Sequence, residues 1–172
     1  MATEAAPLDQ ADPGGDEDRD YPSALLVGST CLLRFLVTGK PVAKARPRVT
    51  RNGHTYTPET TVTWEQNVGW QVREQLTRIQ VERGVKPTLP FGGRVILDLR
   101  FNFTKPKSTP KKVTSHLKRP DYDNLAKGVT DALQNLGLFK DDSQITDCTV
   151  RKRFATQDHP EGVEIEVTAW QD

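Results

Sequence analysis

The sequence predicts an α+β domain in which helices pack on one mixed or antiparallel sheet. Residues 94–104 alternate apolar and polar side chains, as in a strand with one covered face. Two segments, 58–83 and 123–136, repeat apolar residues at helical spacing. Along the chain the expected order is β, long α, β, α, β, β. We expect a single domain, because 172 residues are enough to bury one core.

Residues 1–30 are predicted to form an acidic arm ahead of a domain that spans residues 31–172. The arm contains seven Asp or Glu residues and one Arg, a net charge of −6, whereas the whole chain has a net charge of +1. The remaining residues therefore carry a net charge of about +7, which suits a nucleic-acid partner.

Met1 to Asp20 is rich in Ala, Asp, Pro and Gly, and we expect it to be disordered. It is either a start-site extension without a role or an arm that competes with nucleic acid for the basic surface. It lacks the basic segment and apolar run of a secretory signal. No stretch of the sequence is long and apolar enough to predict a membrane span.

Residues Cys31 to Thr38 are apolar and β-branched enough for a strand. The segment that follows contains basic residues and no acidic residue, and Asn52-Gly53 predicts a hairpin turn within Arg48 to Tyr56. We expect this segment to hold DNA phosphates; the alternative is a solvated loop that only aids solubility. The basic residues predicted to bind DNA here are Lys40, Lys44, Arg46, Arg48 and Arg51.

A long helix is predicted to begin at Thr57-Pro58, with Thr57 as N-cap, and to end near Gly84. Val62 and Trp70 lie off its apolar face. We interpret them as partly buried packing residues, with a contact between two subunits as the alternative. The apolar face consists of Trp64, Val68, Val72, Leu76 and Ile79.

The alternating strand, Arg94 to Thr104, leads into a second basic segment that again lacks acidic residues. Its position directly before a carboxylate motif favours DNA contact over a merely solvated loop. The residues predicted to bind DNA here are Lys111, Lys112, Lys118 and Arg119.

The stretch from Arg119 to Asp147 contains the candidate chemistry. Its helix has one apolar face, with Asp123 predicted as N-cap, Asp121 just outside and Gly137 as the left-handed C-terminal residue. Two further acids, Asp141 and Asp142, precede a strand expected at Ile145 to Phe154. We expect this helix–turn–strand unit to bring the two acidic pairs together.

Carboxylates that lie close together must be protonated or bound to a cation, because two unit charges ~5 Å apart repel by roughly 3 kcal/mol at an effective dielectric of 20. A bridging cation removes that cost, and oxygen ligands without His or Cys favour Mg²⁺, with Mn²⁺ as a substitute. Lys127 projects from the same side as Asp123 and would add positive charge near a scissile phosphate. The alternative is that the acids are only helix caps and turn residues.

The last two strands, Gln144 to Ala155 and Val163 to Ala169, are expected to form a hairpin with one covered face. The two cysteines, Cys31 and Cys148, read as small buried residues in a reduced cytoplasm. The three histidines are scattered, which argues against a zinc site. The sequence has no phosphate-binding loop, so we expect no nucleotide cofactor.

The motif closely resembles that of the RusA-type Holliday junction resolvases of bacteria and phages: D-x-D-N-L-x-K, a helix with D-A-L, then D-D-x-Q before a strand. The resemblance implies a homodimeric, Mg²⁺-dependent endonuclease that nicks four-way junctions symmetrically in the cytoplasm of a bacterium or phage-infected host. It assigns metal binding to Asp121, Asp123 and Asp142 and the catalytic lysine to Lys127. Supporting roles are expected for Asn124, Asp141 and Asp147. The matching residues are Asp121, Asp123, Asn124, Leu125, Lys127, Asp131, Ala132, Leu133, Gly137, Phe139, Asp141, Asp142, Gln144 and Asp147.

Three classes of function are compatible with the sequence. A metal-dependent, structure-specific endonuclease is favoured. A protein of the same fold that binds DNA junctions without cutting is disfavoured, because all four proposed active-site residues are present. An unrelated metal-binding or interaction domain would follow if the carboxylates only cap helices and turns.

Overall fold

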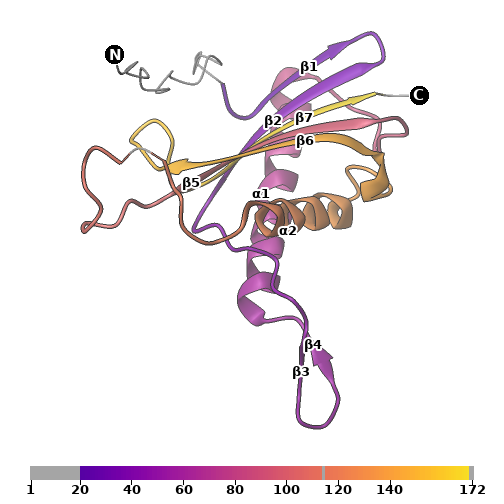
Figure 1. The fold of residues 1–172 in the computed structure, drawn as a ribbon. Coiled ribbons are helices and arrows are strands. Elements are labelled where there is room, and N and C mark those ends of the chain that lie inside the picture. Colours follow the sequence, from indigo (N-terminus) through magenta and orange to yellow (C-terminus); the bar gives the residue numbers. More distant parts are fainter. Residues whose placement is uncertain (1–19, 114, 171–172) are drawn as a thin grey trace, which may run out of the picture.

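The computed structural model describes residues 20–113 and 115–170. They form a mixed five-stranded sheet with two helices packed against it (Figure 1), which confirms the predicted fold class. The sheet order is β1-β2-β7-β5-β6. All neighbouring strands are antiparallel except β5 and β6, which are parallel. The elements are β1 (Ser23–Val27), β2 (Thr30–Thr38), β3 (Arg48–Val49), β4 (Thr55–Tyr56), α1 (Glu59–Arg83), β5 (Val95–Phe103), α2 (Tyr122–Leu136), η1 (Asp142–Gln144), β6 (Ile145–Phe154) and β7 (Gly162–Trp170).

The core lies between the two helices and one face of the sheet. The apolar residues predicted for the inner face of α1 are all buried, as are alternate residues of β2, β5 and β7. Alternation buries one face of a strand because successive side chains point to opposite sides of a sheet. A helix buries a stripe because residues three and four apart share a face.

Both helices begin differently from the prediction. Pro58, not Thr57, is the residue before α1, and Asp121, not Asp123, is the N-cap residue of α2. Neither cap residue makes a side-chain capping hydrogen bond. The ends of the helices agree with the prediction, because Gly84 and Gly137 adopt the left-handed conformation that ends a helix.

The predicted hairpin of the last two strands is wrong. β5 lies between β6 and β7 and pairs with both, so the two strands do not touch as neighbours. The physical reason is the connection through α2: a helix that joins β5 to β6 allows them to lie parallel and adjacent. β7 then pairs with the other edge of β5 and lies between β5 and β2.

The N-terminal segment contributes a strand that the sequence analysis did not predict. β1 pairs with β2 through a tight turn at Gly28, so part of the segment assigned to the acidic arm belongs to the sheet. Residues 1–19 of the predicted arm lie outside the described residues, so the expected disorder of Met1 to Asp20 stays a prediction. Of the two cysteines, Cys31 is buried as expected, but Cys148 is exposed because β6 is an edge strand. None of the described helices is long and apolar enough to cross a membrane.

Two features of the fold position the candidate site. The predicted hairpin is present as β3–β4 and projects away from the body (Figure 1). The segment before it crosses the first turns of α2, where the backbone N–H of Lys44 donates to the carbonyl of Asn124 at 2.8 Å. Gly128 makes this crossing close, since a Cβ there would lie 3.5 Å from the carbonyl oxygen of Val42.

Candidate active site

The N-terminal end of α2 presents the first acidic pair. Asp121 and Asp123 are both exposed, and their carboxylates lie near the positive end of the helix dipole. The Asp121 carboxylate is not used as a helix cap, whereas Asp123 accepts a hydrogen bond of 3.3 Å from the amide of Asn124. The two carboxylates therefore face solvent with lone pairs available to a ligand.

The second acidic pair divides into one structural and one exposed carboxylate. Asp141 caps η1 by accepting a hydrogen bond of 2.9 Å from the backbone of Ser143. The hydrogen bonds from Ser143 lower the pKa of Asp141 below its usual value. Gln144 fixes the same turn through bonds to the backbone at Phe91 and Gly93. This framework holds Asp142 at the surface, next to α2.

Lys127 joins the two halves of the motif. Its ammonium lies 2.7 Å from Asp142 Oδ2, although the two residues are 15 positions apart, and 2.9 Å from Asp131 Oδ1. The hydrogen bonds that Lys127 donates to Asp142 and then to Asp131 raise its pKa well above its usual range. Lys127 is therefore a positive charge held beside the middle of α2, one helical turn after Asp123.

A further ion pair extends this cluster into the body of the protein. Lys44 contacts Asp131 Oδ2 at 3.1 Å and Glu65 Oε1 of α1 at 2.5 Å. Burial alone would lower the pKa of Lys44, but its hydrogen bonds to these two carboxylates raise it. Lys44 was predicted to bind DNA, yet its ammonium is engaged inside the protein, where it ties α1 and α2 to the crossing segment.

Asp147 is not brought to this cluster. Val150 of β6 packs against the core on the helix side of the sheet. Three residues earlier, Asp147 therefore points to the opposite face, where it accepts a hydrogen bond of 2.9 Å from Thr146. Its place in the motif does not correspond to a place near α2.

The donor set suits a hard divalent cation in its chemistry, since Asp121, Asp123 and Asp142 are all carboxylates. As the side chains lie, however, no three His, Cys, Asp or Glu residues within the described part of the chain form a metal-binding group. The ammonium of Lys127 stands beside Asp142, where it neutralises the carboxylate as a metal ion would. Assignment of the three acids as metal ligands stays a prediction.

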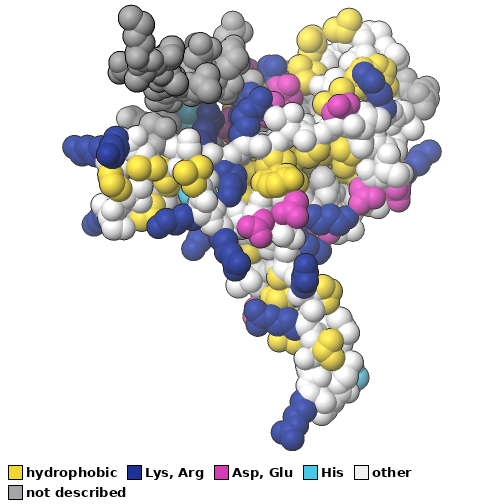
Figure 2. All heavy atoms as spheres, in the orientation of Figure 1, with side chains coloured by type: hydrophobic (Ala, Val, Ile, Leu, Met, Phe, Trp, Pro, Cys, Tyr) yellow, Lys and Arg dark blue, Asp and Glu magenta, His cyan; other side chains and the backbone are white. Residues whose placement is uncertain are grey.

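Basic side chains flank the cluster. Figure 2 shows Lys and Arg side chains along the projecting hairpin and along the loop on the other side of a small acidic group. The predicted DNA-binding residues other than Lys44 are all exposed, which leaves them accessible to phosphates. They are Lys40, Arg46, Arg48, Arg51, Lys111, Lys112, Lys118 and Arg119.

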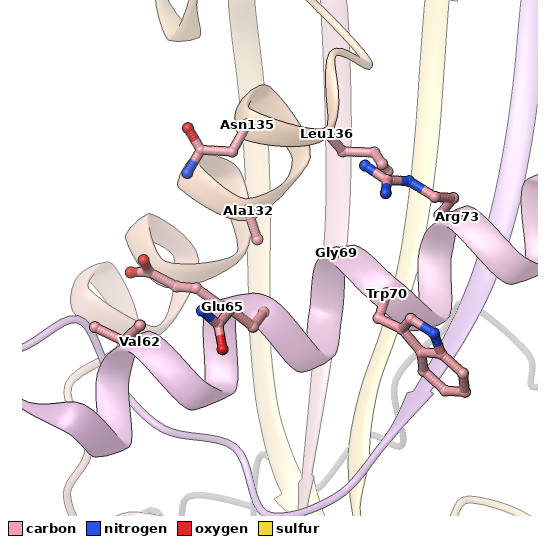
Figure 3. A pocket seen from close by; sticks show the side chains of 9 residues that line it. Val62, Glu65, Gly69, Trp70, Arg73, Ala132, Asn135 and Leu136 are labelled. Atoms are coloured by element: carbon pink, nitrogen blue, oxygen red, sulfur yellow. The ribbon is translucent and has the colours of Figure 1, made fainter.

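A hollow of about 390 Å³ lies between α1 and α2, and Glu65 is one of the residues that line it (Figure 3). Ala132 of α2 faces Gly69 of α1 across it. Trp70 is 64% exposed, so the interpretation of Trp70 as a partly buried packing residue is wrong. The hollow contains no group of acids or nucleophiles that would make it a second centre of chemistry.

Sequence reasoning missed Glu65 as a member of the cluster. It included Asp131 in the motif but did not predict its ion pairs with Lys127 and Lys44. The spacing of Lys127 and Asp131, four residues apart on one helix, was a usable signal for an ion pair. No local pattern relates Glu65 or Lys44 to them, because these residues lie on other elements.

Three comparisons with known proteins bear on this arrangement. A family model described as "Endodeoxyribonuclease RusA" matches residues 38–168. The chain is 31% identical over 150 residues to a Bacillus subtilis (strain 168) protein, "Uncharacterized protein YqaN", covering 80% of this chain and 98% of that protein. Among solved structures it is similar to the Agrobacterium tumefaciens protein Atu1372, described as of unknown function, with 10% identity and a TM-score of 0.46. That match covers 87% of this chain and 80% of the other.

Proposed function

The chain belongs to the RusA endodeoxyribonuclease family, and on this basis we propose that it resolves four-way DNA junctions by paired nicks that require Mg²⁺. Membership in the family implies a nuclease that acts on branched DNA. The metal requirement, the roles of individual residues and a homodimer are parts of the proposal.

The single observation that supports this assignment best is the contact between Lys127 and Asp142. It joins the helical half of the motif to the half before β6, so that residues 15 positions apart meet beside α2. Asp121 and Asp123 lie at the N-terminal end of the same helix. The proposal assigns these three acids to the metal and Lys127 to the scissile phosphate.

A bound Mg²⁺ would supply charge stabilisation at the phosphodiester and a more nucleophilic water. The protein's own groups do the rest. The exposed basic residues on both sides of the cluster hold the phosphate backbone. The Lys127 ammonium, kept charged by its carboxylate partners, offers a positive charge to the phosphate oxygens as negative charge grows there. Because Lys127 is half exposed, it is accessible to DNA.

The function is tested with a synthetic four-way junction incubated with protein and Mg²⁺, against the same mixture with EDTA. We expect symmetric nicks only with Mg²⁺. Asp123→Asn should abolish cleavage but leave junction binding intact, because a carboxylate facing phosphate does not add affinity.

Asp147→Asn is the matched control. It removes an acid of the same motif that lies on the opposite face of the sheet, so we expect it to cleave like wild type. Junction binding without cleavage by the wild-type protein would instead assign the chain to the class that binds junctions without cutting. Loss of binding in a folded Asp123→Asn protein would contradict its role as a metal ligand.

A further inference from the structure

Asp131 lies one helical turn after Lys127, and its carboxylate sits between two ammonium groups. Asp131 Oδ1 contacts Lys127 Nζ at 2.9 Å and Oδ2 contacts Lys44 Nζ at 3.1 Å. The Asp131 side chain is only 18% exposed, whereas Asp142 is 45% exposed. Of the two partners of Lys127, Asp131 is thus the one held inside the protein.

The far side of Asp131 is anchored. Lys44 is fixed from two directions, by Glu65 Oε1 at 2.5 Å and by its own backbone N–H, which donates to the carbonyl of Asn124. Charges therefore alternate from Glu65 through Lys44, Asp131 and Lys127 to Asp142. Three elements that are separate in the sequence, α1, the crossing segment and α2, support the position of one ammonium.

If Asp142 binds a metal ion, the metal competes with Lys127 for the charge of this carboxylate and weakens its hold on the lysine, whereas Asp131 keeps its contacts to both ammonium groups. We propose that Asp131 is the positioning residue of Lys127: braced by Lys44, it holds the ammonium beside the middle of α2 independently of Asp142. This inference rests on the proposed function for its catalytic meaning, but the positioning itself is a property of the protein without metal or DNA.

The positioning is tested first by NMR of the side-chain ammonium groups. Asp142→Asn removes the exposed partner of Lys127, as engagement of Asp142 by a metal would. We expect the Lys127 ammonium signal to stay protected from exchange with water in Asp142→Asn and to disappear in the Asp131→Asn/Asp142→Asn double variant. Loss of the signal in Asp142→Asn alone would overturn the proposal, because Asp131 would then be insufficient to hold the lysine.

Cleavage kinetics give the second test. Asp131→Asn should lower kcat by about 10- to 100-fold, since a small displacement of a catalytic group is costly. The KM for the junction should change by less than about twofold, because the carboxylate is only 18% exposed and both its oxygens contact ammonium groups of the protein. Asp131→Glu, which keeps the charge, should recover part of the loss. Glu82→Gln, which breaks an exposed ion pair on α1, is the control and should cleave like wild type.

A double-mutant cycle separates positioning from a general loss of structure. If Asp131 acts through Lys127, the Lys127→Ala/Asp131→Asn variant should be no slower than Lys127→Ala alone. An additive loss, or an Asp131→Asn variant with wild-type kcat, would contradict the proposal. If the wild-type protein cuts no branched DNA, the proposed function fails, while the NMR comparison still decides whether Asp131 holds Lys127.

Discussion

At the scale of single residues, charged groups in this protein are arranged by what they can pair with. Lys127 and Lys44 are held by carboxylates from other turns and elements, whereas Asp121 and Asp123 are left facing solvent. A second network lies near the end of the sheet, where Glu164 is buried. It accepts hydrogen bonds from Asn102 at 2.9 Å, Arg153 at 2.7 Å and Tyr21 at 3.3 Å, and it faces His159 at 2.9 Å.

The buried Glu164 leads to a prediction about acid stability. Burial would raise the pKa of Glu164, but hydrogen bonds from Asn102 and the charge of Arg153 lower it overall. Because the pKa of Glu164 is lower in the folded state, its ionised carboxylate stabilises the protein at pH values above its ordinary pKa of 4.5. This stability is lost as the pH falls through the folded pKa. Glu164→Gln should therefore reduce the free energy of unfolding by about 2 kcal/mol at pH 7, measured by urea denaturation.

As the pH falls below 4.5 and through the folded pKa of Glu164, the two proteins should become more similar, because the wild-type carboxyl then becomes neutral, as the Gln amide is. A difference that does not shrink at all as the pH is lowered until the wild-type protein unfolds would contradict this assignment. Glu82→Gln is the matched control: its ion pair with Arg78 is exposed, so its removal should cost only about 0.3 kcal/mol.

At the scale of elements, α2 connects the sheet to the candidate site. Its buried face packs on the core, its N-terminal end carries Asp121 and Asp123, and its first turns are crossed by residues 42–44. α1 has a different task at the edge of the sheet. Its side chains Gln71 and Gln75 pair with the backbone of Thr38 and Leu36, which satisfies a strand edge that β1 does not cover.

The crossing over α2 predicts different outcomes for two substitutions of Gly128. A Cβ there would lie at ordinary contact distance, 3.5 Å from Val42 O and 3.7 Å from Lys44 N. Gly128→Ala should fit, retain cleavage and stabilise the protein by up to about 1 kcal/mol through helix propensity. Gly128→Leu should push the crossing segment away, break the bond from Lys44 to Asn124 and reduce cleavage.

Thermal unfolding and junction cleavage of both variants check this prediction. Gly69→Ala in α1 is the control for helix propensity alone, because nothing lies within 4 Å of a Cβ at that position. Wild-type cleavage by a folded Gly128→Leu protein would show that the crossing segment does not support the site.

At the scale of the whole molecule, charge is distributed around the acidic cluster. The exposed basic residues extend from the projecting hairpin to the loop before α2 (Figure 2), and one of the groups of acidic side chains in this view lies between them. A phosphate backbone drawn to this surface would pass over the end of α2.

The hairpin therefore predicts how DNA binding depends on salt. Removing two phosphate contacts with Arg48→Ala/Arg51→Ala should reduce the slope of log affinity against log salt by about 2. Fluorescence anisotropy of a labelled junction between low and high salt measures that slope. Arg78→Ala, on α1 and paired with Glu82, is the control and should leave the slope unchanged. An unchanged slope in the hairpin variant would place the DNA elsewhere.

The proposed homodimer predicts a specific product from a mixed assembly. A four-way junction has two equivalent strands, and a two-fold dimer places one site at each. A dimer of one wild-type and one Asp123→Asn subunit, isolated through two different tags, should nick one strand and leave the junction unresolved on a native gel. The doubly tagged wild-type dimer is the control and should resolve it. Full resolution by the mixed dimer would argue against one site per strand.

The sequence by itself determined the local features of this protein. Periodicity identified both helices and the strands β5 and β7, because burial of one face imposes a repeat of 2 or 3.6 residues on the chain. Apolar, β-branched composition identified β2. The residue types of the sequence also identified the motif around Asp121, because its residues lie close together in the chain. The predicted N-cap residues of the two helices differ from the observed ones, because Asp and Pro are acceptable at several positions around a helix start.

Only the tertiary structure decided which elements meet. It inserted β5 between β6 and β7, turned Asp147 to the face opposite α2, and joined Lys44 and Glu65 to Asp131. Nothing in a local pattern encodes these outcomes, because strand pairing and ion pairs between distant residues depend on the path of the whole chain through α2 and its crossing segment. The position of Lys127 is the clearest case: the motif contained the lysine and both carboxylates, and the fold brought Asp142 to the lysine and braced Asp131 with Lys44.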